Sequence, residues 1–147
     1  MCYIYTNNQH PLMCERASDE NPIIAGATLS ATYQTSGATC VTAEVRSDDE
    51  LTLLVKYVEG SAETGNVCEV EVSFSPDGTN WAIYGVWSDG GSGQMAYTQQ
   101  FFNVPQSTNA LIALDGVLAR WIRIRLKEEG VASNAGTASV WLYRNKK

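Results

Sequence analysis

The chain has little of what enzyme active sites usually contain. Its 147 residues include a single histidine, His10, which lies beside a proline in an irregular N-terminal stretch. A Ser-His-Asp or Cys-His arrangement needs a histidine that surrounding structure holds in place. This context predicts instead an exposed histidine or one packed within that stretch. We therefore expect no enzymatic activity and assign no catalytic residue.

Metal-binding patterns are also scarce. No CxxC pair and no neighbouring histidine accompany the four cysteines, which are Cys2, Cys14, Cys40 and Cys68. Reduced structural thiols are the expectation, with a disulfide as the alternative. Asp48, Asp49 and Asp77 would suit a calcium site at the rim of a sandwich, but their spacing matches no calcium loop. We expect these carboxylates to solvate or cap turns, and we predict no metal and no cofactor.

Long apolar runs and excess positive charge are missing too. No segment approaches the roughly 18 to 20 apolar residues that span a bilayer, and the N-terminus lacks the pattern of a secretory signal. Sixteen acidic residues against ten basic ones give a net charge of -6. That balance argues against binding to nucleic acid or to an anionic membrane. The expectation is a protein made in a cytoplasm.

What the chain does have is alternation, most clearly in VCEVEVSFSPDGTNW at residues 67–81. One face of this segment carries Cys68, Val70, Val72 and Phe74, and the other carries Glu69, Glu71, Ser73 and Ser75. The pattern predicts a half-buried antiparallel strand. Pro76 and Gly78 then predict a hairpin turn with a bulge, in which Gly78 has a positive φ and Trp81 opens the next strand.

Similar segments recur along the chain and set the predicted fold class. The expected strands are residues 24–33, 40–46, 51–58, 67–75, 81–87, 94–104, 110–114, 118–127 and 137–144. Short strands at this spacing predict an all-β protein, an antiparallel β-sandwich that is jelly-roll-like, over residues 23–147. Residues 1–22 break both strand and helix periodicity and are expected to form an irregular N-terminal arm.

Alternation also divides the strands into an inward and an outward face. The inward sets are Leu51, Leu53, Val55 and Tyr57, then Ile122, Ile124 and Leu126, then Ala138, Val140 and Leu142. The outward residues include aromatic and arginine side chains, which protein interfaces favour. We predict an interface at Trp121, Arg123, Arg125, Trp141 and Tyr143, on the solvent side of adjacent strands. The alternative is that residues 1–22 or a second layer cover this face.

A glycine-rich segment, SDGGSG at residues 88–93, superficially suggests a phosphate-binding loop. It lacks the Lys-Ser/Thr pair and the following helix that such loops need. We interpret it as a flexible loop between strands, whose tip is available to contact a partner.

Two stretches resemble small β-sandwich proteins from the structural gene clusters of tailed bacteriophages. They are LTLLVKYVEGSAETGNVCEVEVSFSPDGTNW and LARWIRIRLKEEGVASNAGTASVWL, and the similarity covers roughly residues 40–143. Residues 119–123, ARWIR, are also similar to the late strand of galactose-binding-like jelly rolls. The chain departs from those in lacking a recognisable sugar platform of aromatic and arginine side chains.

The first resemblance implies a non-enzymatic virion protein. The expected role is a capsid decoration or cement protein that binds neighbouring capsid subunits, as a homo-oligomer or in many copies on a symmetric shell. A neck or tail component and a carbohydrate-binding or adhesion module are the alternatives. The expected location is the virion, after synthesis in the host cytoplasm.

Overall fold

A computed structural model of the chain describes residues 22–45, 49–106, 108–114, 119–130 and 133–146. Within these ranges the chain forms eleven strands and no helix. No helix among the described residues has the length and apolarity needed to cross a bilayer. The predicted N-terminal arm and His10 lie outside the described residues, apart from Pro22.

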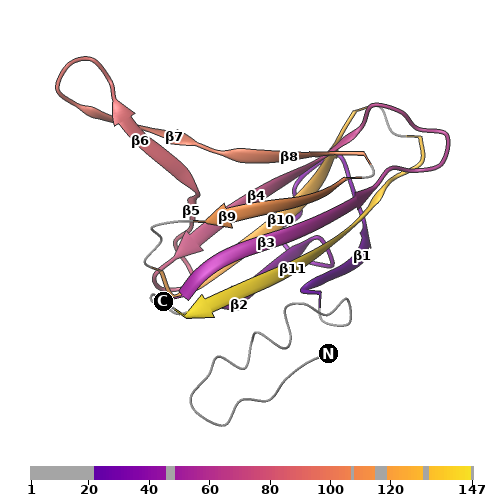
Figure 1. The fold of residues 1–147 in the computed structure, drawn as a ribbon, viewed down its shortest axis with the longest axis horizontal. Helices are drawn as coiled ribbons and strands as arrows, with labels where there is room; N and C mark the ends of the chain where they lie inside the picture. Colours follow the sequence, from indigo (N-terminus) through magenta and orange to yellow (C-terminus); the bar gives the residue numbers. More distant parts are fainter. Residues whose placement is uncertain (1–21, 46–48, 107, 115–118, 131–132, 147) are drawn as a thin grey trace, which may run out of the picture.

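Nine of the described strands belong to two antiparallel sheets that face each other (Figure 1). The first sheet has the order β1 (Ile24–Thr28), β11 (Thr137–Lys146), β3 (Asp49–Val58), β9 (Asn109–Leu114). We call it sheet A. Sheet B has β2 (Cys40–Glu44), β10 (Trp121–Glu129) and β4 (Val67–Ser75), with β5 (Ala82–Ile83) and β8 (Phe101–Pro105) both paired to β4. β6 (Gly85–Asp89) and β7 (Met95–Gln99) form a separate two-stranded sheet.

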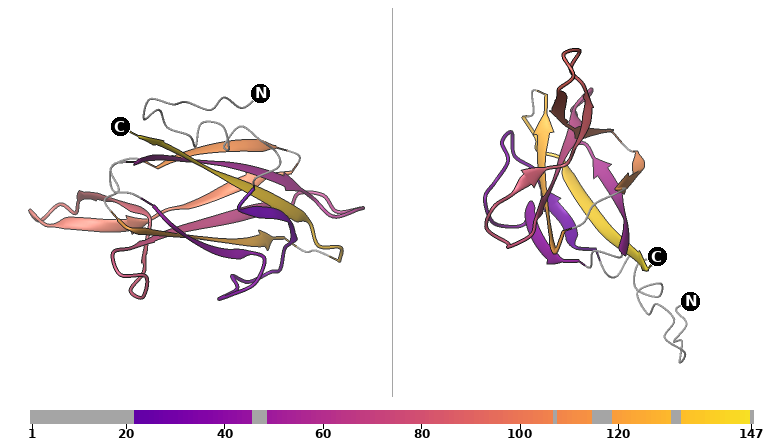
Figure 2. Two further views of the ribbon diagram at one scale, coloured as in Figure 1. Left: turned by 90° about the horizontal axis from the view of Figure 1, so that it is seen from below. Right: turned by 90° about the vertical axis from the view of Figure 1, so that its left-hand side faces the viewer.

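The chain crosses repeatedly between the two main sheets. β1, β3, β9 and β11 lie in sheet A, whereas β2, β4, β8 and β10 lie in sheet B. The antiparallel pairing within both sheets confirms the predicted all-β antiparallel class. Figure 2 shows the two layers edge-on.

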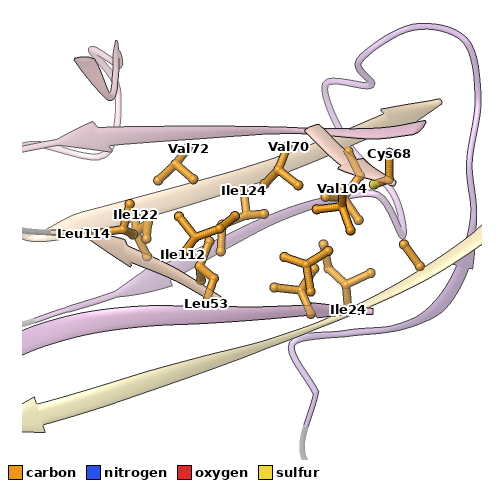
Figure 3. Packing of buried hydrophobic residues seen from close by; sticks show 14 of the residues in the cluster. Ile24, Leu53, Cys68, Val70, Val72, Val104, Ile112, Leu114, Ile122 and Ile124 are labelled. Carbon is orange, nitrogen blue, oxygen red and sulfur yellow. The ribbon is translucent and has the colours of Figure 1, made fainter. Parts of the chain in front are cut away.

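The core lies between the sheets and follows the predicted faces. Leu53 and Ile112 of sheet A point toward Val72 and Ile124 of sheet B, and all four are buried (Figure 3). The three predicted inward sets are confirmed, with Leu142 only partly buried against the core. Apolar side chains at every second position supply the burial that stabilises such a sandwich.

One prediction about β4 is wrong. Glu71, Ser73 and Ser75 face away from the core, as expected, but they are only 2%, 0% and 0% exposed. β4 is therefore buried on both faces. The cause is that side chains from β10 and from the connections at residues 29–39 and 76–81 cover its polar face, which alternation along one strand does not reveal.

The edge of sheet B beside β4 is built in two parts. β5 pairs with Ser73 and Phe74, and β8 pairs with residues 67–71, so the two short strands occupy one strand position. The Tyr84 amide continues the ladder by donating to the Val72 carbonyl at 2.7 Å. The predicted continuous strands 81–87 and 94–104 are therefore wrong: each breaks where the chain leaves this edge.

Between Tyr84 and Gln100 the chain leaves the sandwich as a two-stranded hairpin, β6–β7. We call this hairpin the arm, which is distinct from the N-terminal arm predicted for residues 1–22. The Gln100 amide donates to the Tyr84 carbonyl at 2.8 Å and closes its base. The arm projects beyond the end of the sandwich (Figures 1 and 2). The predicted loop at residues 88–93 is right in place but not in bounds: Ser88 and Asp89 still belong to β6, and the tip begins at Gly90, whose amide donates to the Gln94 carbonyl.

The turn after β4 matches the sequence prediction closely. Gly78 has a φ of 77°. The Asp77 carboxylate accepts hydrogen bonds from the backbone amides of Thr79 and Asn80, each at 2.8 Å, and caps the turn as expected. Only the start of the next strand differs, because β5 begins at Ala82 and not at Trp81.

Candidate functional site

The five residues predicted to form one interface lie on two different surfaces. β10 carries Trp121, Arg123 and Arg125 between β2 and β4 of sheet B, whereas β11 carries Trp141 and Tyr143 between β1 and β3 of sheet A. The two strands are not neighbours, and their outward faces point to opposite sides of the sandwich. The prediction that the five residues share one face is therefore wrong. Alternation along a strand shows whether a side chain points inward or outward, but it does not show to which sheet the strand belongs.

The arginines of β10 are held by a buried carboxylate. Arg125 makes a bidentate contact with Glu71, since its Nε and Nη2 each donate at 2.8 Å. Arg123 Nη2 lies 4.0 Å from the same carboxylate. Such planar, charge-assisted pairs are strong and geometrically specific. These arginines thus neutralise Glu71 within the chain, whatever else they contact.

Aromatic rings cover the same arginines. The Arg123 guanidinium lies 4.6 Å from the centroid of the Trp81 ring, and that of Arg125 lies 5.2 Å from the Tyr33 ring. Cations over ring faces attract electrostatically. The Tyr33 hydroxyl donates to Glu69 at 2.7 Å. Burial, and then this hydrogen bond, raise the pKa of Tyr33 above its ordinary value, so the hydroxyl stays protonated at neutral pH.

Most polar groups on this outer face of sheet B have partners within the chain, whereas the buried Nε of Arg123 has no hydrogen-bond partner among the described residues. The side chains of Arg123 and Arg125 are 23% and 18% exposed. Trp121 is also partly covered: its ring lies against Gly78 and beneath the Arg120 guanidinium. An interface role for these residues stays a prediction, with less exposed surface than their positions suggested.

On the outer face of sheet A, Trp141 is only 7% exposed. It pairs in register with Leu54, which pairs in turn with Leu111, so an apolar row crosses three strands. Among the described residues, the buried Trp141 Nε1 has no hydrogen-bond acceptor. Leu111 on β9 is the exposed end of the row, and Tyr143, two residues after Trp141 on β11, is partly buried.

Four of the seven large apolar side chains that are exposed among the described residues lie together on the arm. Trp87 and Met95 are 65% and 60% exposed, and Val86 and Tyr97 are exposed as well. All residues from Val86 to Gln99 are exposed, which no strand of the sandwich body shows along its whole length. Large exposed apolar groups gathered in one place mark interaction surfaces.

Register assigns the arm's side chains to two faces. Trp87 pairs with Tyr97 and Asp89 pairs with Met95, so these four residues share one face, while Val86, Ser88, Ala96 and Thr98 share the other. The Trp87 and Tyr97 rings are in contact, with centroids 5.2 Å apart. Gly85 makes room for this arrangement, because a Cβ there would lie 2.8 Å from the Tyr97 ring.

Sequence reasoning recognised the tip of the arm but not its aromatic face. The signal was present: Trp87 and Tyr97 flank the glycine-rich tip at matching distances, as partners in a hairpin do. The alternation of residues 81–87 and of residues 94–104 instead predicts one continuous strand of the sandwich in each case, which hides the hairpin.

At the end of the sandwich away from the arm, hydrogen bonds within the chain hold the buried Glu128, whereas the buried Oε2 of Glu59 has no partner among the described residues. Glu128 accepts a hydrogen bond from the buried Tyr57 hydroxyl and a bifurcated one from the Gly136 amide, which is shared between its two carboxylate oxygens. It also lines a cavity of about 300 Å³ together with Leu29 and Gly130. No group of three or more histidine, cysteine, aspartate or glutamate side chains within the described ranges is placed to hold a metal ion.

No protein-family model and no curated protein sequence matches this chain.

Proposed function

We propose that the protein is a non-enzymatic structural protein of a phage virion, a head decoration or cement protein that binds neighbouring capsid subunits. The observation that carries the proposal is the arm, a projecting hairpin on which the Trp87 and Tyr97 side chains are exposed. The phage assignment itself comes from the sequence resemblance over residues 40–143.

Three physical features support an assembly role. The sandwich is built on long, fully paired strands, which provide a rigid base. The net charge of -6 keeps the unassembled protein soluble. The exposed Trp87 and Tyr97 are residue types that dominate interface energetics, since they bury large areas with few rotatable bonds. Repetition on a symmetric shell would add many modest contacts into firm attachment.

The rival function, a carbohydrate-binding or adhesion module, draws on the same two rings. By register, Gln99 lies on the same face of the arm as the exposed Trp87 and Tyr97, so an amide side chain accompanies the two rings. However, the two rings are inclined by 47°, so they do not present one flat platform. Binding of the purified chain to a glycan array, lost on Trp87→Ala, would favour this rival.

The direct test is the copy number of the chain in purified particles of its source, measured by quantitative mass spectrometry. Hundreds of copies per particle would support head decoration. A handful would support a neck or tail position and overturn the cement role. The complete absence of the chain from particles would overturn the virion assignment.

A second test separates the arm from the sandwich body. Trp87→Ala with Tyr97→Ala should abolish addition of the purified protein to particles that lack it, while Leu111→Ala should not. Leu111 is a matched control because it is an exposed apolar residue, 69% accessible, on the outer face of sheet A. Thermal unfolding must first show that both variants are folded. Normal addition of the arm variant would overturn the role of the arm.

A further inference from the structure

We propose that the aromatic face of the arm binds the same face of a second copy of this chain, so that two arms pack face to face in opposite directions. This inference rests on the proposed function, because it names the partner of the surface that carries it. It concerns the face that holds Trp87, Tyr97, Met95 and Asp89.

The first argument is geometric. The arm extends away from the end of the sandwich, so its own body does not cover this face (Figures 1 and 2). A two-stranded hairpin alone is marginally stable in water and gains most from packing one face against another layer. If two arms point in opposite directions, their sandwich bodies lie at opposite ends and do not collide.

The second argument is the order of side chains along the face. The Trp87–Tyr97 pair occupies the middle of the hairpin, between Gly85 at the base and Met95 near the tip. A two-fold axis through the middle therefore places aromatic rings against aromatic rings. It also places Met95 of each copy opposite Gly85 of the other, where the Tyr97 ring lies over the glycine, and sulfur–aromatic contacts of this kind are favourable.

The third argument is charge. Asp89 is the only charged residue from Gly85 to Gln99. In the opposed arrangement the two Asp89 side chains lie at opposite ends of the contact, so like charges are kept apart. Each Asp89 already accepts a hydrogen bond from the Gly91 amide of its own tip at 2.9 Å, so packing does not strand an unsatisfied carboxylate.

The contact is small, because each arm contributes two five-residue strands. Interfaces of this size are typical of weak association. We therefore expect a concentration-dependent equilibrium between monomer and dimer, and not a permanent dimer.

The experiment is sedimentation of the purified chain over a concentration series. The weight-average mass should rise from the monomer value of 16.0 kDa toward twice that value. Trp87→Ser with Tyr97→Ser should keep the monomer mass throughout. Val86→Ser, on the opposite face of the same hairpin, should associate like the unaltered chain. A mass that stays monomeric up to about 1 mM would overturn the inference.

Cross-linking tests the symmetry independently. Tyr97→Cys lies near the proposed axis and should give a covalent dimer under mild oxidation, beyond any formed by the unaltered chain. Thr98→Cys, which faces the other way, should not. Equal cross-linking of both variants would overturn the face-to-face arrangement.

The two proposals fail in different ways. If the chain is monomeric but the arm variant fails to join particles, the arm binds a different virion protein and only the pairing of copies is wrong. If the chain dimerises through the arm but is missing from particles, the pairing stands and the virion assignment falls.

Discussion

Two adjacent residues shape the turn between β4 and β5 for different reasons. Gly78 supplies a backbone conformation that other residues avoid, because its φ is 77°. Asp77 supplies hydrogen-bond acceptors to Thr79, Asn80 and Ser75. The first contribution is steric and independent of pH, whereas the second depends on the charge of a carboxylate. Substitutions at the two positions should therefore respond differently to pH.

Gly78→Val should lower the free energy of unfolding by about 1 to 3 kcal/mol, because a β-branched residue is strained at positive φ. Space is not the obstacle, since a Cβ at this position would meet the Trp121 ring at ordinary contact distance, 3.4 Å. Urea unfolding of Gly78→Val and of Thr79→Val, the matched neighbour, provides the measurement. Equal stabilities would contradict the strain argument.

Asp77→Ala should cost stability at neutral pH and progressively less in acid. Hydrogen bonds from the backbone amides of Asn80 and Thr79 hold the pKa of Asp77 well below its ordinary value. Its stabilising effect is thus fully present above the unfolded-state pKa of about 3.9 and is lost as pH falls toward the lower folded-state pKa. Urea unfolding of both proteins at several pH values measures this. A constant difference across the acid range would contradict it.

At the scale of elements, the outer face of sheet B is an example of what sequence alternation can and cannot predict. The faces of β4 and β10 were predicted correctly, because period-two alternation is a local property. The burial of Glu71 was not, because it depends on Trp81 and Tyr33, which approach from connections outside both strands. Likewise, alternation could not show that β10 and β11 belong to different sheets.

Glu71→Gln should destabilise the chain by about 2 to 4 kcal/mol, because it leaves the partly buried Arg125 without its charged partner. Glu44→Gln is the control. Glu44 pairs with Arg120 at 2.8 Å, but both side chains are more than half exposed. Its loss should cost at most about 1 kcal/mol. Chemical denaturation of the two variants makes the comparison, and similar losses would show that the Glu71 pair is no stronger than a surface pair.

Removing the arm should leave the sandwich folded. β5 and β8 already share one strand position beside β4, and the Gln100 amide bonds to the Tyr84 carbonyl. Replacing residues 85–99 by a short glycine–asparagine turn should therefore preserve cooperative unfolding, with a small change in midpoint. A chain that no longer unfolds cooperatively would show that the arm is part of the folding unit.

At the scale of the whole molecule, the core explains why fold class was predictable. Two sets of alternating apolar residues, one from each sheet, meet across a single interior. A chain of this size buries enough surface to fold without external ligands. The arm was not predictable in the same way, because its aromatic residues look like those of a buried strand until the pairing of β4 is known.

We expect folding to be independent of metal ions. The Asp77 carboxylate accepts hydrogen bonds from Thr79 and Asn80 within its own turn. Asp48 lies outside the described residues. Thermal unfolding with and without a strong chelator should therefore give the same midpoint. A decrease of many degrees in the chelator would revive a cation site at the rim of the sandwich.

The arm also sets how far one molecule can reach. A five-residue extended strand covers about 17 Å, and Trp87 lies two residues, or about 7 Å, along it from Gly85, so a contact made by Trp87 and Tyr97 lies beyond the base of the arm. Subunits joined in this way would keep their sandwich bodies apart and would pivot about the two chain segments at the base of each arm. A single sequence could then bridge sites whose spacing and curvature differ, as neighbouring positions on a closed shell do, without any change in the sandwich itself.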